Sequence, residues 1–302
     1  MSGQQTGPIA DLSYRNYDGP KGLSKARWWP IAKSGLKTSF KKKGFWVLAA
    51  VSLLPYVLVI FMLFASTFGG GRTQSFLPPF SSLLAGVYGG GFWPFMLALL
   101  VGAGSIAADN RANALQVYLA KPITKRDYLI GKWFYIFAIV FTVYFAPLLL
   151  LTSFQALTLG FGDFFRSYPL MYPQLVLLSV IPAFVHASVL VGLSAWNRTP
   201  WLVGVIYAGI FIFANFFAMI MREAIESSSE KAAATIGSLS IEGAISGIGA
   251  NLLGAAPRSV LPGDGGGAIP HVFPLILILV IVSGVGLLLA SMRIRAVEVV
   301  KG

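Results

Sequence analysis

Residues 108–132 carry side chains that could form specific polar contacts with another molecule, and they are the most charged interruption between two long apolar stretches of this chain. Asp109 can cap a short helix in which Leu115 and Leu119 fall on one face. Pro122 should end that helix, because proline lacks the backbone N–H that a continuing helix needs. The first half of the segment therefore predicts a short amphipathic helix.

A second helix should begin just after this proline. Thr124 is followed three residues later by Asp127, and this spacing is typical of a capping box. The helix that it opens would continue into the next apolar stretch. Together the two helices predict an amphipathic elbow on one face of a membrane, and such an elbow is suited to docking another protein.

The chain lacks the sequence patterns of common catalytic sites. It has no Walker A motif, so we do not expect it to hydrolyse ATP by itself, and it has no HExxH motif or nucleophile elbow. It also has no cysteine, which excludes thiol chemistry. We therefore expect a protein that is not an enzyme and has no catalytic residue, metal or cofactor of its own.

Titratable side chains are scarce in the long apolar stretches. All eleven acidic residues lie outside them, and His186 is the one histidine inside. A lone histidine in such a place is more often a hydrogen-bonded packing residue than a ligand or a proton relay. Because ion-coupled pumps usually place charged residues within the membrane, we expect the energy for any transport to come from outside the bilayer.

The composition places the chain in a membrane. Hydrophobic residues make up 56% of it, charged residues only 11%, and the mean hydropathy is +0.74, which is more apolar surface than a soluble core could bury. Six uncharged stretches have about the 20 residues that a transmembrane helix needs. The predicted fold is an all-α polytopic membrane protein with six transmembrane helices, at residues 45–66, 87–107, 133–153, 175–196, 201–221 and 272–291.

The distribution of basic residues predicts the topology. An even number of spans puts both termini on one side, and 18 of the 23 Lys and Arg residues lie on that side, which makes it cytoplasmic. The net charge of +12 then reflects topology and anionic lipid, and does not indicate nucleic-acid binding. The predicted parts are a basic cytoplasmic tail (1–43), a membrane domain (44–292) with the elbow (108–132) and a long extracytoplasmic loop (222–270), and a cytoplasmic C-terminal tail (293–302).

The N-terminal tail should contain an interfacial helix that starts near Pro30. Basic residues at spacing four form a ridge on it, beside apolar residues: Lys33, Lys37 and Lys41. Such a helix would lie in the lipid headgroups as a lead-in to the first span, or would in addition touch a partner protein.

The 222–270 loop should contain a further helix. Isoleucine and leucine repeat there at helical spacing among glycines, at Ile241, Ile245, Ile248 and Leu252. This pattern is typical of an amphipathic or re-entrant helix. It leaves open whether the loop gates a path, meets a partner or covers the helix ends.

Three residues of the second and fifth spans are candidates for lining a transport path: Phe92, Trp93 and Asn215. Small residues are frequent in both spans, and helix packing is the simplest explanation for them. The alternative is that the two spans line a path. With no charge there, a lipidic, apolar or glycan-type substrate fits better than an ion.

The order of residues in 108–132 resembles the cytoplasmic coupling segment of type-2 ABC transporter permeases. In that family the segment typically runs through an acidic residue, Gly-Thr-Leu, Leu-Leu, Pro, Ser-Arg and Gly-Lys. This chain lacks the Gly-Thr pair. The corresponding positions are Asp109, Asn113-Ala114-Leu115, Val117 to Leu119, Pro122, Lys125-Arg126 and Gly131-Lys132.

This resemblance implies the permease subunit of an ABC exporter in the cytoplasmic (inner) membrane of a bacterium. It implies a second permease copy or a homologue as partner, forming a homo- or heterodimer, and separate ATPase subunits that bind ATP and Mg²⁺. The alternative is a non-transporting structural or assembly subunit of a larger membrane complex. The ATPase-docking residues expected from the resemblance are Asp109, Arg111, Leu115, Leu119, Pro122, Thr124, Arg126, Asp127 and Lys132.

Overall fold

The computed structural model describes residues 26–68, 78–89, 91–114, 123–225, 229–256 and 268–293, and the regular secondary structure in these ranges is helical throughout. Six runs of helix within them are long and apolar enough to cross a membrane, which confirms the predicted fold class. They are α2 (Lys43–Phe68), the run of α3 (Phe80–Tyr88), α4 (Phe92–Gly102) and α5 (Ala107–Arg111), then α7 (Lys125–Leu159), α9 (Met171–Trp196), α10 (Pro200–Ile225) and α13 (Val272–Arg293).

The second span differs from the single helix that its hydropathy predicts. It begins at Phe80 instead of near residue 87, and it is interrupted after Tyr88 and again after Gly102. The first interruption contains Gly89 and Gly91, and glycine loses more backbone entropy in a helix than any other residue. The apolar stretch is therefore divided into three short helices.

The third span is longer than predicted. Its helix, α7, starts at Lys125, eight residues before the uncharged stretch, because Thr124 caps it there. Hydropathy marks only the part of a helix that is apolar, so it misses polar turns at the ends.

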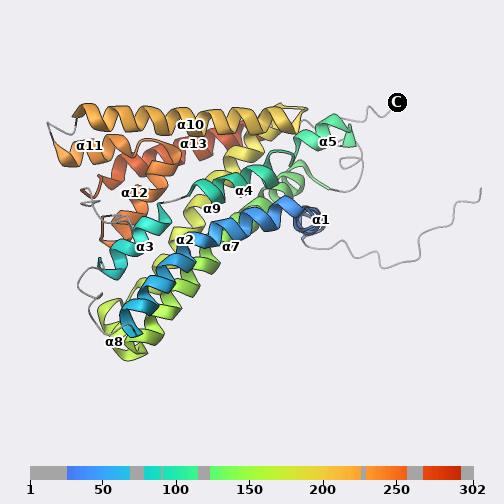
Figure 1. Ribbon diagram of the computed structural model, residues 1–302. Coiled ribbons are helices and arrows are strands. Elements are labelled where there is room, and N and C mark those ends of the chain that lie inside the picture. Colours follow the sequence, from blue (N-terminus) through green and yellow to red (C-terminus); the bar gives the residue numbers. More distant parts are fainter. Residues whose placement is uncertain are drawn as a thin grey trace, which may run out of the picture.

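Among the six spans, α9 is the most buried, and it packs between α7 and α13 (Figure 1). Gly192 of α9 and Gly286 of α13 face each other where the two helices cross. A Cβ atom added to either glycine would overlap with backbone atoms of the opposite helix. Glycine at these two positions thus permits direct backbone contact between the helices.

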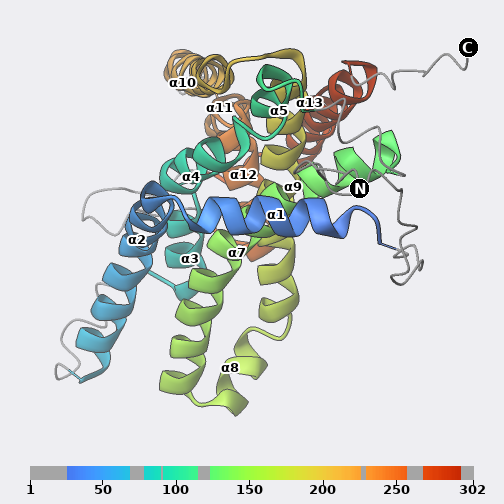
Figure 2. The same cartoon turned by 90° about the vertical axis from the view of Figure 1, so that its right-hand side faces the viewer.

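The N-terminal helix α1 (Trp29–Phe40) is the helix predicted from Pro30, and it lies across α7 (Figure 2). Its Trp28 end packs against Phe134 of α7, with the ring centroids 4.9 Å apart. Lys33 and Lys37 are exposed, whereas Ile31 is buried. Residues 1–25 of the predicted basic tail, and residues 294–302 of the C-terminal tail, lie outside the described part of the chain.

The end of the molecule away from α5 is formed by α3 and three short helices, which are α8 (Phe161–Ser167), α11 (Glu230–Gly237) and α12 (Ile241–Leu253) (Figure 1). The helix predicted in the 222–270 loop is confirmed as α12, with Ile241, Ile245 and Ile248 buried. Gly254 ends it in the left-handed conformation, at φ +62°.

Candidate functional site

An ion pair joins the two ends of the elbow. Lys132 Nζ lies 2.7 Å from Asp109 Oδ2, and the two side chains are only 13% and 18% exposed. The Tyr128 hydroxyl donates a hydrogen bond of 2.7 Å to the same carboxylate oxygen. The acidic residue of α5 is therefore bound twice to the start of α7.

The capping box predicted at the start of α7 is present. The Asp127 N–H donates to Thr124 Oγ1, and the Thr124 N–H donates to Asp127 Oδ2, each at 3.1 Å. The Thr124 hydroxyl also donates to Oδ2 at 2.7 Å. Two of the amides that a helix start leaves unpaired are thus satisfied locally.

The prediction that Asp109 caps a helix is wrong, because Asp109 itself lies inside α5. The helix predicted to follow it, with Leu115 and Leu119 on one face, lies largely outside the described residues. Asp109 is the third residue of α5, and the N-cap residue Ile106 makes no side-chain capping bond. Ser194 of α9 caps this helix instead, because its hydroxyl oxygen accepts from the N–H groups of Ile106 at 2.9 Å and Ala107 at 2.8 Å. Ser194 in turn donates to the Ala103 carbonyl oxygen at 3.0 Å.

Two further contacts that the sequence did not reveal fix the elbow to other spans. Asn110 Nδ2 donates to the carbonyl oxygens of Ala195 and Asn197, both at 3.1 Å, at the end of α9. Lys125 Nζ donates to the Ser291 carbonyl oxygen on α13. These partners are more than 80 residues apart in sequence, so no local pattern indicates them.

The remaining residues of the predicted docking set divide into two groups. Arg111 and Arg126 are exposed at the elbow. Leu115, Leu119 and Pro122 lie outside the described residues.

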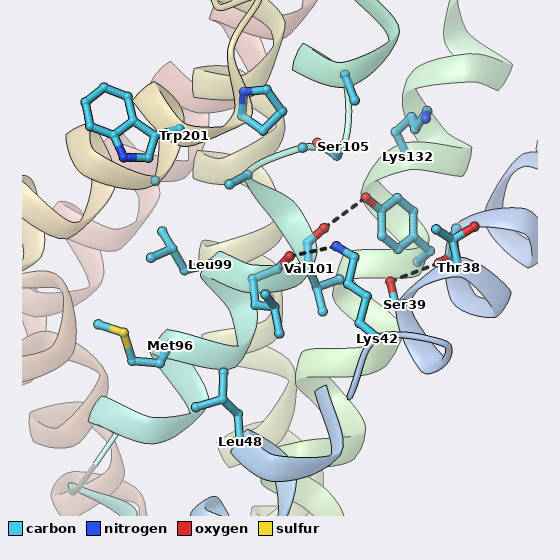
Figure 3. A pocket seen from close by; sticks show the side chains of 18 of the residues that line it. Thr38, Ser39, Lys42, Leu48, Met96, Leu99, Val101, Ser105, Lys132 and Trp201 are labelled. Atoms are coloured by element: carbon cyan, nitrogen blue, oxygen red, sulfur yellow. Dashed lines mark hydrogen bonds between the residues drawn. The ribbon is translucent and has the colours of Figure 1, made fainter. Parts of the chain in front are cut away.

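A lateral cavity of about 1110 Å³ lies between the second and fifth spans on one side and α1, α2 and α7 on the other. Figure 3 shows Met96 and Leu99 of α4 and Trp201 of α10 on one side of it, with Lys42 and Lys132 on the other. Most of its lining side chains are apolar. We call it the lateral cavity below.

The polar groups of the lateral cavity gather near the end of α4. Lys42 Nζ donates to the Leu100 carbonyl oxygen at 3.0 Å, and the Tyr135 hydroxyl donates to that of Val101 at 3.3 Å. The last carbonyls of a helix lack intrahelical partners and carry partial negative charge, so a lysine there is favourable. The Asp109–Lys132 pair lines the same region.

The three candidate path residues are not brought together. Phe92 and Trp93 line the lateral cavity, at the start of α4. Asn215 lies elsewhere, between α10 and α12, where its Oδ1 accepts from the Ser240 hydroxyl at 2.9 Å and its Nδ2 donates to the Phe211 carbonyl oxygen at 2.8 Å.

His186 is fully buried, and its Nδ1 lies 2.8 Å from the Tyr207 hydroxyl. This arrangement fits a hydrogen-bonded packing residue. In the part of the chain that the structure describes, no three His, Asp or Glu side chains stand close enough to hold a metal ion.

Comparison with models of known protein families identifies a match over most of the chain. Residues 29–291 match the family model described as "ABC-2 family transporter protein". No curated protein matches the chain.

Proposed function

The chain belongs to the ABC-2 family of transporter proteins, and from this membership we propose that it exports an apolar or lipidic substrate with energy from a separate ATPase. As a member of this family it is a multi-pass membrane protein and a permease component of an ABC transporter. The proposal adds the direction of transport, the substrate class, the ATPase docking site, and a place in the inner membrane of a bacterium.

The elbow supports docking of an ATPase because of what it is attached to. Asp109 bonds α5 to α7, and Ser194 and Asn110 bond α5 to α9. Lys125 bonds the start of α7 to α13. A force applied to the elbow would therefore reach three spans directly. Arg111 and Arg126 are exposed there and would contact the ATPase.

The lateral cavity supports the substrate class. Its walls are mostly apolar, and its polar side chains, Lys42 and the Asp109–Lys132 pair among them, lie toward the elbow. This distribution suits an amphiphile whose apolar part lies along α4 and α10 and whose polar group lies near Lys42. An inorganic ion would find few ligands along most of the cavity.

The rim of the lateral cavity supports a second permease copy. Trp201 of α10 is 75% exposed, and Phe92 and Trp93 of α4 are also exposed. A second copy or a homologue packed along α10 would cover these rings and close the open side of the cavity.

Co-purification with an ATPase from the native host tests the proposal. We expect Arg126→Glu to reduce the ATPase recovered with the full-length chain at least about tenfold, because it places a like charge where a cation should dock. Arg166→Glu is the matched control, since Arg166 is exposed on α8 at the other end of the molecule. Equal recovery with both variants would overturn the docking assignment, and a large complex without any ATPase would favour an assembly subunit.

A further inference from the structure

Glu242 is a buried carboxyl group that belongs to neither site described above. It is the second residue of α12 and is 6% exposed. Neither of its carboxyl oxygens has a hydrogen-bond partner among the described residues. Buried polar groups are nearly always paired, so an unpaired carboxyl calls for a physical explanation.

The carboxyl group lies against the break in the second span. A Cβ atom added to Gly91 would fall on the Glu242 side chain, so the carboxyl occupies space that only glycine leaves. One turn further along α12, Ser246 lies in the same way against Gly89. Residues four apart share one face of a helix, so Glu242 and Ser246 place the same face of α12 against Gly91 and Gly89. This face therefore lies along the end of α3 and covers the break before α4.

Four buried tyrosines from four helices lie within electrostatic range of the carboxyl group: Tyr56 of α2, Tyr88 of α3, Tyr144 of α7 and Tyr207 of α10. The Tyr88 hydroxyl donates to the Leu178 carbonyl oxygen at 2.9 Å, and the Tyr207 hydroxyl pairs with His186 of α9. The buried Tyr144 hydroxyl has no partner among the described residues. None of these hydroxyls is hydrogen-bonded to Glu242.

The charged side chains of the neighbouring helices do not compensate a negative charge at Glu242. Each of them is exposed or lies at the end of its helix. They are Lys43 of α2, residues 125–132 of α7, Arg222 and Glu223 of α10, Glu230 and Lys231 of α11, and Arg293 of α13. Desolvation therefore dominates, and burial raises the pKa of Glu242 to about 8. At neutral pH the docked carboxyl group is protonated.

We propose that Glu242 is a proton-binding site, and that its bound proton holds α12 against the break in the second span. Loss of the proton leaves an unpaired negative charge among apolar and tyrosine side chains, which is strongly unfavourable. The charge is relieved when α12 moves away from Gly91 and water reaches the carboxyl group. This inference goes beyond the proposed transport function and does not depend on the substrate.

The direction of the pH dependence follows from the two protonation states. When water reaches it, the carboxyl group regains an ordinary pKa near 4.5, so the docked form binds the proton more tightly than the undocked form. Docking is therefore strongest at acidic pH and weakens as pH rises. The ratio of docked to undocked α12 falls about tenfold for each pH unit between 4.5 and 8, and is constant above that range.

Thiol labelling measures this equilibrium directly, because the chain has no cysteine. Ser246→Cys places a single thiol at the docked face of α12, and Ser167→Cys places one at the exposed end of α8. The ratio of their labelling rates with a water-soluble maleimide, in full-length protein in nanodiscs, cancels the pH dependence of the thiol itself. We expect this ratio to rise about tenfold per pH unit between 5 and 8, and to be constant when Glu242→Gln is added.

Infrared spectroscopy supplies a second readout that does not need the cysteine at position 246. The carbonyl stretching band of a protonated carboxylic acid should be present at pH 7, fall to about half near pH 8, be lost at higher pH, and be absent from Glu242→Gln. A labelling ratio that does not change with pH, or that changes equally in Glu242→Gln, would overturn the proposal. So would the lack of this band at pH 7, as expected if a metal cation held an ionised carboxylate. These outcomes are independent of ATPase co-purification.

Discussion

Lys132 Nζ is 2.7 Å from Asp109 Oδ2, so one ion pair closes the base of the elbow between α5 and α7. The Tyr128 hydroxyl shares the same carboxylate oxygen. One carboxylate thus joins α5 to the start of α7 through two side chains.

Removing either member of this pair should loosen the elbow. We expect Asp109→Asn or Lys132→Gln to lower the free energy of unfolding by about 1–3 kcal/mol, because each removes one charge of a mostly buried ion pair. The double variant should cost less than the sum of the two. Arg166→Gln is the control: its contact with Asp163 is 4.0 Å long and highly exposed, so denaturant unfolding should detect almost no change. Strict additivity of the two elbow variants would show that the pair does not interact.

Ser194→Ala should expose the start of α5. The variant leaves the N–H groups of Ile106 and Ala107 without their acceptor, at a cost of about 1–3 kcal/mol. We expect hydrogen exchange at these two amides to become roughly ten- to a hundredfold faster. Ser179→Ala is a suitable control, since that buried hydroxyl donates to the Leu175 carbonyl oxygen of its own helix. Unchanged exchange in Ser194→Ala would mean that the cap is not formed in the membrane.

Gly286→Ala should separate α9 from α13. Its new methyl group would overlap with the Ser188 carbonyl group, and we expect a loss of about 1–3 kcal/mol of stability. Gly284→Ala lies on the same helix, and its Cβ would meet nothing within 4 Å, so it should be neutral. Thermal unfolding in detergent distinguishes the two, and equal midpoints would argue against the close crossing.

Gly204→Trp should fill the lateral cavity. Gly204 lines the cavity from α10, and a Cβ there meets no atom within 4 Å, so the indole has room without disturbing the fold. We expect binding of a fluorescent fatty-acyl probe to fall at least about tenfold, while the ATPase still co-purifies. Gly209→Trp on the same helix is equally free of contacts but does not line the cavity, and it should bind the probe normally.

The features that the sequence predicts correctly depend on neighbouring residues. Hydropathy over about 20 residues is a local property, and it locates six spans. The capping box is also local, since Thr124 and Asp127 are three residues apart. The residues of α12 repeat at helical spacing, and this short helix is predicted for the same reason.

The features that the sequence does not predict depend on tertiary contacts. Ser194 caps α5 from another span, and no residue near Asp109 in the sequence indicates this partner. Glu242 lies outside the spans, as expected for an acidic residue, and yet it is buried because α12 folds back against Gly91. Hydropathy describes where a segment prefers to lie, and it does not describe which side chains the folded chain will enclose.

The direct backbone contact of Gly192 with Gly286 has a mechanical consequence. No side chain separates the two backbones at this crossing, so a shift of α9 against α13 there would bring backbone atoms into contact. The ends of α5 and α7 are bonded to this pair through Ser194 and Lys125. A displacement of the elbow would therefore be passed to α9 and α13 together, and the undocking of α12 would take place against this pair.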